Sequence, residues 1–390
     1  MNVLFVLYES IDSNSGLHVQ ELARHLTRLG ADTVAAVYRP GGPGEGSEAA
    51  VRTVGFRDGA TVARAFADGR PPDIVHAWTP RENVRTFCER LRKAFPFKLV
   101  VHLEDNEECL LERLLGVPFE TLARNADTVV PETLSHPTRY REFLASADGA
   151  TVIVDPLREF VPAGKPSLLL WPGVDTERFS PRAAGHRLAA QARLPAGTLV
   201  LGYTGNVHPA NAREVRSVYI AAALLSREGQ PAVVLRTGRD FCAFLGEDDS
   251  WARPHARELG VLPYDRLPDA LAMADVLVQP GRPDRFNDYR FPSKLPEYLA
   301  MGKPVVTPRA NLGLHLTHRR EALVYPVVDA LQIVEAAREV AADRALRRQL
   351  AEGSVAFVKA HLDWRRRSES LKEFYEGLAG IDRRTRAEAG

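Results

Sequence analysis

The chain alternates short apolar runs with stretches of helical periodicity, and this alternation limits its fold more than any other feature. NVLFVLY (residues 2–8), DIVHAW (73–78) and KLVVHL (98–103) are apolar runs rich in Val, Ile and Leu, and LHVQELARHLTRL (17–29) is an amphipathic stretch. Continuous apolar runs are typical of strands that helices cover on both faces. The pattern therefore predicts an α/β fold with doubly wound parallel sheets.

A second series of the same kind begins after Pro195. Its predicted strands are TLVLGYTG (198–205), AVVLRTG (232–238), DVLVQPG (275–281) and GKPVVTP (302–308). At 390 residues the chain is also longer than one ordinary domain. We therefore expect two consecutive Rossmann-like domains and a ligand at the carboxyl ends of their strands, where open α/β sheets bind.

The loop after the first strand argues against one class of chemistry. ESIDSNSGLH (9–18) holds a single glycine, Gly16, where the dinucleotide fingerprint needs G-x-G-x-x-G. This absence disfavours a dehydrogenase that transfers hydride. A nucleotide in a cleft between two domains remains the favoured ligand.

Composition disfavours several other classes. A net charge of +1 gives no general attraction to nucleic acid or anionic lipid, and no apolar run is long enough to span a membrane. The three cysteines are scattered and lack metal spacing, which predicts a reduced, cytoplasmic protein. The acidic runs EDNEE (104–108) and GEDD (246–249) have no identifiable histidine or carboxylate partner. We interpret them as loop charge and expect no metal site.

The segment RFPSKLPEYLAMGKPVV (290–306) carries the most specific candidate site. Ser293 is predicted to cap a helix whose first backbone N–H groups attract anions. Lys294 adds a positive charge suited to phosphate, and Glu297, one turn further, is placed to accept hydrogen bonds from sugar hydroxyls. Together they suit a ligand with a diphosphate and a ribose. An ordinary amphipathic helix with solvated charges is the alternative interpretation.

Several segments, taken together, resemble a known family. In the second half they are WPGVDTERFSP (171–181), YTGNVHPAN (203–211), LGVLPYDRLPDALAMADVLVQP (259–280) and the segment 290–306. In the first half, the matching features are Gly16, DIVHAW and His102. In this order and over nearly the whole chain, the sequence resembles the GT-B glycosyltransferases and is most similar to the retaining glycosyltransferase family 4.

The resemblance implies two Rossmann-like domains that face a central cleft. Residues 1–170 would bind the acceptor, residues 171–362 would bind the nucleotide-sugar donor, a helix at 363–380 would return to the N-terminal domain, and 381–390 would be a flexible tail. The implied activity is metal-independent transfer of a sugar, with retention, from a nucleotide-diphosphate sugar to a glycan, lipid-linked or small-molecule acceptor. A UDP-sugar is the expected co-substrate, and no cofactor is expected.

The resemblance also implies the site residues. GT-B enzymes without a metal stabilise the leaving diphosphate with basic side chains and a helix N-terminus. The expected catalytic residues are His102, Arg290 and Lys294. The expected donor-binding residues are Gly16, Gly205, Asn206, Arg213, Leu262, Tyr289, Phe291, Pro292, Ser293, Leu295 and Glu297.

Two departures from the family pattern keep a second hypothesis open. Tyr289 stands where many members have a glutamate that orients the donor sugar, and no lysine follows the turn at Gly205. Arg290, Lys294 or Arg213 would have to supply the missing charge. The alternative is a non-catalytic GT-B protein that binds nucleotide or glycan as a partner or regulatory subunit. The donor sugar, the acceptor and the oligomeric state stay open.

The stretch RENVRTFCERLRKAFPFK (81–98) also has two interpretations. It places Val84, Phe87, Leu91 and Phe95 on one helical face with basic residues around them. A helix that lies on a membrane surface and reaches a lipid-linked acceptor has this pattern. An ordinary helix packed on a sheet has it too, and we favour that interpretation.

Overall fold

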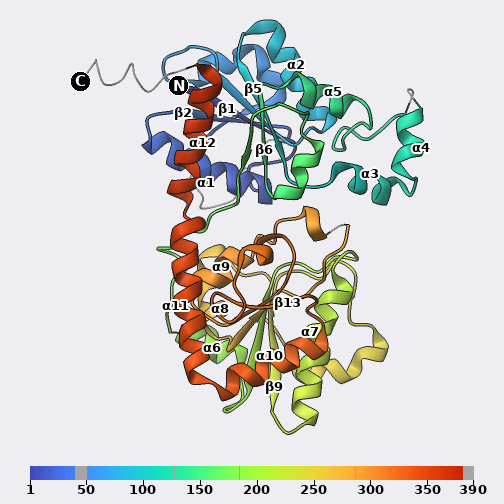
Figure 1. The fold of residues 1–390 in the computed structure, drawn as a ribbon, viewed down its shortest axis with the longest axis vertical. Helices are drawn as coiled ribbons and strands as arrows, with labels where there is room; N and C mark the ends of the chain where they lie inside the picture. Colours follow the sequence, from blue (N-terminus) through green and yellow to red (C-terminus); the bar gives the residue numbers. More distant parts are fainter. Residues whose placement is uncertain (40–50, 126–127, 184, 286, 381–390) are drawn as a thin grey trace. The chain divides into compact units, whose positions relative to one another are not determined.

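The computed structural model describes residues 1–39, 51–125, 128–183, 185–285 and 287–380, and it forms two compact units (Figure 1). The first unit comprises Met1–Gly173, Tyr289–Phe291 and Trp364–Gly390, and the second comprises Val174–Asp288 and Pro292–Asp363. The division after Gly173 lies close to the expected division at 170/171. Residues 40–50 and the tail expected at 381–390 lie outside the described residues.

The first unit is built on a parallel sheet of seven strands in the order β3-β2-β1-β4-β5-β6-β7. Its strands are β1 (Asn2–Leu7), β2 (Asp32–Val37), β3 (Arg52–Gly55), β4 (Ile74–Trp78), β5 (Lys98–Leu103), β6 (Gly149–Val152) and β7 (Ser167–Leu169). Its helices are α1 (Asn14–Arg28), α2 (Glu82–Ala94), α3 (Glu107–Leu115), α4 (Phe119–Arg124), α5 (Arg139–Ser146) and α12 (Trp364–Ala379), with 3₁₀ segments η1 (Phe56–Ala65) and η2 (Asp155–Phe160). The strand order reverses between β1 and β4, so the ligand edge is expected at the carboxyl ends of these two strands.

The second unit repeats this plan with six strands in the order β10-β9-β8-β11-β12-β13. Its strands are β8 (Leu199–Thr204), β9 (Ala232–Thr237), β10 (Ala256–Glu258), β11 (Val276–Val278), β12 (Val305–Pro308) and β13 (Leu323–Tyr325). Its helices are α6 (His186–Ala192), α7 (Ala212–Arg227), α8 (Leu267–Ala272), α9 (Leu295–Ala300), α10 (Ala330–Ala342) and α11 (Arg344–His361). The 3₁₀ segments in this part of the chain are η3 (Glu247–His255), η4 (Tyr264–Arg266), η5 (Asn287–Tyr289) and η6 (Asn311–His315). The order reverses between β8 and β11. The predicted α/β fold with two parallel sheets is confirmed.

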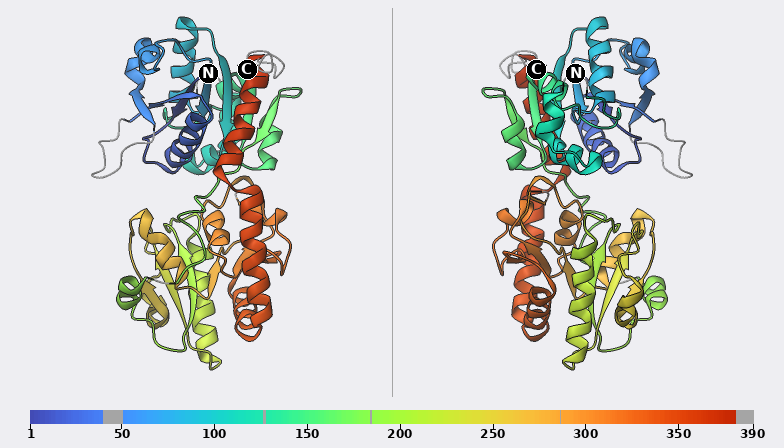
Figure 2. Two further views of the ribbon diagram at one scale, coloured as in Figure 1. Left: turned by 90° about the vertical axis from the view of Figure 1, so that its left-hand side faces the viewer. Right: turned by 90° about the vertical axis from the view of Figure 1, so that its right-hand side faces the viewer.

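Alternation along β1 explains how the first sheet is covered. Leu4 and Val6 point into one buried cluster, and Phe5 and Leu7 point into another, because successive side chains of a strand face opposite sides. Helix α2 covers the first face, while α1 and α12 cover the second and pack against each other (Figures 1 and 2). The C-terminal helix therefore belongs to the core of the first unit.

The close packing of α12 requires a glycine in the sheet. A Cβ atom on Gly149 in β6 would lie 2.8 Å from the ring of Phe374, closer than carbon atoms normally approach. Tyr375 and Leu371 of the same helix are completely buried. The sheet and the C-terminal helix are thus fitted to each other.

Helix α2 buries the apolar face that left two interpretations open. Val84, Phe87 and Leu91 are at most 2% exposed and lie in the core of the first unit. The structure thus supports the interpretation of a helix packed on a sheet, because protein covers this face. Within the described ranges, no helix has the length and apolar character needed to cross a membrane.

Candidate functional site

The carboxyl edge of the second sheet begins with two glycine turns in contact. Gly205 follows β8 with φ of 118°, and Gly238 follows β9 with φ of 103°, a region that favours glycine. A Cβ on Gly238 would lie 2.5 Å from the carbonyl carbon and oxygen of Gly205, so only glycine fits there. The Gly205 N–H donates to the Thr237 carbonyl at 3.1 Å. The two turns at this edge therefore carry backbone without a side chain.

Asn206 joins the same two turns. Its Oδ1 accepts a hydrogen bond from the Arg239 N–H at 2.8 Å, and the Val207 N–H donates to the Arg239 carbonyl at 2.8 Å. Just beyond, the exposed rings of His208 and Phe241 stack with centroids 4.8 Å apart. Asn206 thus shapes the edge on which a ligand would lie.

Helix α9 comes next to these turns because Tyr298 anchors it. The buried Tyr298 hydroxyl accepts a hydrogen bond from the Thr204 N–H at 2.7 Å, which ties the helix to the end of β8. A Cβ on Gly205 would lie 3.3 Å from the Nζ atom of Lys294. Lys294 Nζ also donates to the Tyr203 hydroxyl at 3.0 Å and lies 4.3 Å from the centroid of that ring. The structure therefore brings Gly205 and Lys294 together, as the sequence suggested.

The predicted capping role of Ser293 is wrong. The N-cap position of α9 is Lys294, and no side chain makes a capping hydrogen bond there. The Leu295 N–H donates to the Pro292 carbonyl at 2.8 Å, so a turn brings the chain into the helix one residue later than expected. Pro296 in the first turn also lacks an N–H, which reduces the number of amides at the helix mouth. Leu295 is buried in the packing of the helix rather than exposed to a ligand.

Glu297 has a partner that the sequence did not indicate. Its Oε1 accepts a hydrogen bond from the Tyr264 hydroxyl at 2.9 Å. Burial raises the pKa of Glu297 to about 7, against the opposing effects of the Tyr264 hydrogen bond and of the positive charges of Lys294 and Arg178. A carboxylate between these groups lies one helical turn from the glycine edge, where it can accept further hydrogen bonds.

The remaining predicted donor residues of the second unit are less closely tied to this edge. Arg213 is exposed in the first turn of α7, and Leu262 is half-buried in the loop after β10. Pro292 is half-buried directly before the turn into α9. Tyr264, the hydrogen-bond partner of Glu297, lies two residues after Leu262 in a segment that already resembled the family. This position was the one sequence signal that could have identified it as a site residue.

Tyr289, Arg290 and Phe291 belong to the first unit rather than to the unit that holds Lys294. The Tyr289 hydroxyl donates to Glu159, and its ring packs 5.9 Å from that of Phe160. Arg290 Nε lies 3.9 Å from a carboxylate oxygen of Asp105. The aromatic side chains of Tyr289 and Phe291 anchor this segment on the core of the first unit.

Gly16 has a steric role at the start of α1. A Cβ there would lie 2.0 Å from the Ile11 carbonyl oxygen, and the Gly16 N–H donates to the capping Ser13 hydroxyl at 3.1 Å. The glycine therefore permits the tight turn that leads from β1 into the helix. Ser15, the next residue back, contributes its hydroxyl to the edge of the first sheet.

That edge centres on Glu104, which follows β5. Its carboxylate accepts hydrogen bonds from Ser15 Oγ and Trp78 Nε1, each at 2.6 Å, and its nearer oxygen lies 3.8 Å from His18 Nδ1. Burial raises the pKa of Glu104 to about 7. We expected loop charge in this acidic run. That interpretation is wrong for Glu104 and Glu107, because both carboxylates are engaged inside the first unit. A carboxylate directly after a strand beside the reversal of strand order is the signal that the sequence offered.

His102 lies under the same edge. It is 1% exposed at the end of β5, and its ring lies 4.1 Å, centroid to centroid, from that of Trp78. Burial, together with the nearby His76 and His18, holds the pKa of His102 well below its usual range. The imidazole is therefore neutral at physiological pH, so one ring nitrogen donates a hydrogen bond and the other accepts one.

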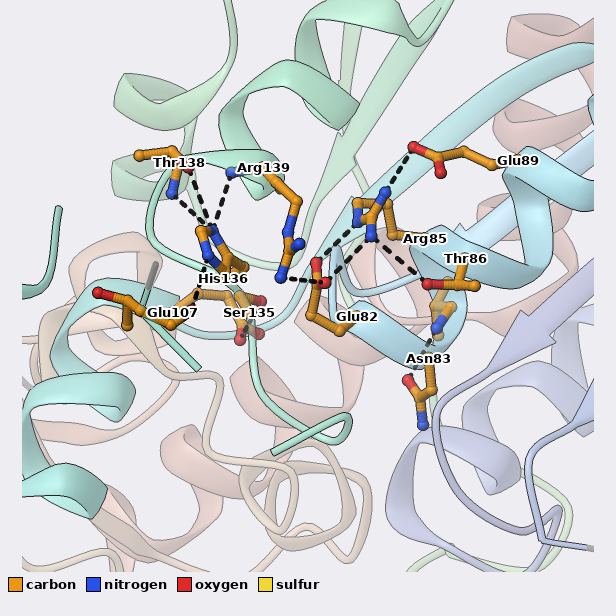
Figure 3. Close-up of polar contacts among 12 residues, drawn as sticks. Glu82, Asn83, Arg85, Thr86, Glu89, Glu107, Ser135, His136, Thr138 and Arg139 are labelled. Atoms are coloured by element: carbon orange, nitrogen blue, oxygen red, sulfur yellow. Dashed lines mark hydrogen bonds and ion pairs between the residues drawn. The ribbon is translucent and has the colours of Figure 1, made fainter. Parts of the chain in front are cut away.

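A second polar network fixes the neighbouring loop to α2 and α3 (Figure 3). Glu82 accepts hydrogen bonds from Arg85 at 2.7 and 3.0 Å and pairs with Arg139 at 3.0 Å. Ser135 donates to Glu107 at 2.8 Å, and Arg81 lies 3.4 Å from the same carboxylate. These ion pairs hold the charges of this region within the fold. Across the described ranges, no group of three or more His, Cys, Asp or Glu side chains is arranged to hold a metal ion.

Comparison with known proteins agrees with this architecture. Residues 229–373 match the model of the glycosyl transferase-like family. A sequence comparison with curated proteins found no significant match. Sucrose-phosphate synthase from Thermosynechococcus elongatus superposes with a TM-score of 0.69 at 17% identity, over 98% of this chain and 100% of that one. The chain has the GT-B fold.

Two further structures share this GT-B fold. HepE of Anabaena, in complex with UDP-glucose, gives a TM-score of 0.70 at 13% identity over 98% of this chain and 100% of that one. A glycosyltransferase from Rickettsia africae gives 0.71 at 12% identity over 98% and 99% of the two chains. The predicted resemblance to GT-B glycosyltransferases is confirmed at the level of the fold. The finer assignment to family 4 is compatible with these matches and stays a prediction.

Proposed function

We propose that this GT-B protein is a retaining, metal-independent glycosyltransferase that uses a nucleotide-diphosphate sugar. The observation that carries the proposal is the cluster of Gly205, Lys294 and Glu297 at the carboxyl edge of the second sheet. Bare backbone, an ammonium group and a carboxylate within one helical turn match a diphosphate joined to a ribose. The second unit is then the donor domain and the first unit the acceptor domain.

Each member of the cluster has a distinct task in this proposal. The glycine turns let phosphate oxygens approach the backbone, and Lys294 supplies the positive charge. Glu297 accepts hydrogen bonds from ribose hydroxyls, and these favour its charged form, so donor binding lowers its raised pKa. UDP is the nucleotide we favour, since HepE, which shares the fold, has been crystallised with UDP and with UDP-glucose.

Leaving-group stabilisation without a metal needs fixed positive charge near the diphosphate. We assign this task to Lys294 and Arg290, whose guanidinium group can bridge two phosphate oxygens. His102 at the edge of the first sheet is assigned to the sugar undergoing transfer. The three unpaired cysteines fit the cytoplasmic location that we propose.

A thermal-shift screen against nucleoside diphosphates and nucleotide sugars tests the donor class. A ligand that binds only the folded state raises the unfolding temperature by mass action, so the preferred nucleotide should give the largest shift at equal concentration. The transfer is tested by incubating the protein with the preferred donor and a mixture of acceptors. NMR of the product then shows whether the anomeric configuration of the sugar is retained, as proposed, or inverted. A protein that binds no nucleotide would contradict the proposal.

The non-catalytic alternative rests on one observation. Tyr289 occupies the position of a family glutamate, and its hydroxyl is bonded to Glu159 in the first unit. If this substitution removes turnover, the protein binds a nucleotide sugar as a partner or regulatory subunit. Tight nucleotide binding without hydrolysis or transfer, across donors and acceptors, would favour this function over catalysis.

A further inference from the structure

A chain of buried hydrogen bonds runs from the C-terminal helix to His102. The Tyr375 hydroxyl of α12 lies 2.6 Å from His76 Nδ1, and His76 Nε2 lies 2.9 Å from Thr151 Oγ1. The same Thr151 oxygen lies 2.8 Å from His102 Nδ1. All four side chains are at most 1% exposed. The chain of hydrogen bonds therefore links α12 to β4, β4 to β6, and β6 to the intervening strand β5, without contact with solvent.

Burial keeps both histidines of this chain neutral. It lowers the pKa of His76 to about 3 and holds the pKa of His102 well below its usual range. Each imidazole then carries one proton, and each hydroxyl carries one. Four hydrogens serve three hydrogen bonds, so the direction of the chain decides where the fourth hydrogen remains.

Three arrangements make all three links, because the Thr151 hydroxyl can donate to either histidine or accept from both, and these arrangements are not equivalent. If Tyr375 donates to His76, His76 donates to Thr151 and Thr151 donates to His102, every hydroxyl hydrogen has an acceptor. The remaining hydrogen then lies on His102 Nε2. In the opposite direction, the Tyr375 hydroxyl hydrogen would be buried with no acceptor among the described residues, and His102 Nε2 would lack a donor as well. If Thr151 accepts from both histidines, its own hydroxyl hydrogen has no acceptor among the described residues, and His102 Nε2 again lacks a donor. The first direction leaves one buried polar group unpartnered, the Nε2–H of His102, whereas each of the other arrangements leaves two. Every buried polar group without a partner is costly, so the first direction is favoured.

We infer that Tyr375, acting through His76 and Thr151, fixes His102 as the neutral tautomer that carries its proton on Nε2. Nε2 is buried and has no hydrogen-bond partner among the described residues. His102 is therefore prepared to donate a hydrogen bond and not to remove a proton at that atom. Tyr375, His76 and Thr151 are positioning residues.

The catalytic consequence rests on the proposed function. If His102 contacts the sugar during transfer, its Nε2–H donates to a sugar oxygen, and no proton changes place in that contact. The acceptor hydroxyl must then lose its proton elsewhere, as it does when the leaving phosphate takes it. The tautomer itself does not depend on this role, so the two inferences can fail separately.

Histidine-selective ¹⁵N labelling of the full chain and a long-range ¹H–¹⁵N correlation spectrum test the tautomer directly. The His102 signal is assigned by its loss in His102→Gln. We expect a protonated Nε2 and an unprotonated Nδ1 at pH 7, with no titration down to pH 5. A proton on Nδ1, or a charged ring at pH 7, would overturn the inference even in a protein without transferase activity.

Two matched variants at Thr151 test the chain of hydrogen bonds. Thr151→Ser keeps the hydroxyl and should keep the tautomer, whereas Thr151→Val removes it at nearly the same volume and should give a mixture. For the transfer reaction, we expect kcat to fall about tenfold in Thr151→Val with little change in KM, and to stay within about twofold in Thr151→Ser. A tautomer unchanged in Thr151→Val would refute the relay, and an altered tautomer with normal kcat would refute its part in positioning.

Tyr375→Phe tests the origin of the direction, and it also covers the case in which Thr151→Val fails to fold. This variant removes the donor of the first link and keeps the ring that packs in the core. We expect the His76 and His102 signals to show both tautomers, with a smaller fall in kcat than in Thr151→Val. Unchanged signals at both histidines would show that Tyr375 does not set the direction.

Discussion

The carboxyl edges of the two parallel sheets have the same topology and opposite character. In the second unit, Gly205 and Gly238 directly follow β8 and β9, and these turns carry no side chain beside the ammonium group of Lys294. In the first unit, β4 ends in Trp78, and His102 is the last residue but one of β5. Their rings pack together, and Trp78 donates a hydrogen bond to the carboxylate of Glu104. We call the edge of the second unit, whose turns are glycine beside a fixed positive charge, the open edge, and the edge of the first unit, which carries buried, hydrogen-bonded side chains, the filled edge.

This difference shows that strand topology determines where a ligand can lie, while the residues that end each strand determine which ligand. Glycine and lysine suit a diphosphate, which needs close backbone approach and positive charge. A neutral histidine suits the uncharged hydroxyls of a sugar, since it donates one hydrogen bond without adding charge. Variants in each edge therefore separate the binding of a diphosphate from the binding of sugar hydroxyls.

The largest expected effect follows removal of Arg290. Arg290→Ala should lower kcat by roughly 10²-fold while donor affinity changes little, because charge on the leaving diphosphate develops only as the glycosidic bond breaks. Steady-state kinetics and calorimetric titration measure the two quantities. Arg213→Ala is the matched control and should be nearly silent. Normal turnover by Arg290→Ala would show that the positive charge comes from the second edge alone.

Chelation of metal ions tests, without a substitution, whether protein side chains supply the positive charge at the diphosphate. Activity in excess EDTA should equal activity in buffer, because Lys294 and Arg290 are proposed to stabilise the diphosphate in place of a metal. Loss of activity on chelation, with recovery on addition of Mg²⁺ or Mn²⁺, would contradict this mechanism. It would also mean that the charge of the open edge is completed by an ion.

Glu297→Ala should weaken nucleotide binding by about 2 kcal/mol, or roughly 30-fold, as expected when a hydrogen bond to a charged group is lost. Calorimetric titration with UDP measures this change. Glu352, an exposed glutamate of α11 in the same unit, gives the matched control Glu352→Ala, which should bind normally. Unchanged affinity in a folded Glu297→Ala would remove this residue from the donor site.

Gly238→Ala tests the bare backbone of the open edge. The new Cβ would meet the backbone of Gly205 at 2.5 Å, so the two turns must separate, and we expect about a tenfold loss of UDP affinity. Gly229→Ala is the control, because Gly229 also has a positive φ of 90° but has nothing within 4 Å of the added carbon. It should cost about 1 kcal/mol of stability and leave affinity unchanged. Equal affinities in both variants would show that the contact of the turns does not shape the site.

The smallest effect concerns the pH dependence of the filled edge. Burial raises the pKa of Glu104 to about 7 in the folded state, so folding favours its protonated form. This contribution is complete below the unfolded pKa and is lost as pH rises through about 7, on the order of 1 kcal/mol. Glu104→Gln should therefore show a flatter fall in the free energy of unfolding between pH 5 and 8, measured by urea denaturation. A wild-type slope in Glu104→Gln would exclude Glu104 as its source.

Periodicity and spacing in the sequence were sufficient for the fold, and the resemblance to a known family supplied most of the candidate site residues. The apolar runs predicted both sheets, because burial on two faces leaves its mark in consecutive residues. The resemblance grouped Gly205 with Lys294 and Glu297, and in the structure a turn after one strand and the start of a nearby helix meet at the same sheet edge. These are local or topological relations, and a sequence expresses them directly.

Tertiary structure alone decided the rest. Tyr375 meets His76 across 299 positions of sequence, and Tyr289–Phe291 joins a unit different from that of its chain neighbours. The start of α9 at Leu295 depended on turn geometry, and the hydrogen bond between Trp78 and the buried carboxylate of Glu104 depended on side-chain packing. Such contacts join residues that are far apart in the sequence and belong to no common periodic pattern. They form only when the helices and strands pack together. The sequence determined which edges could hold a ligand, and packing determined the protonation and the partners of the groups found there.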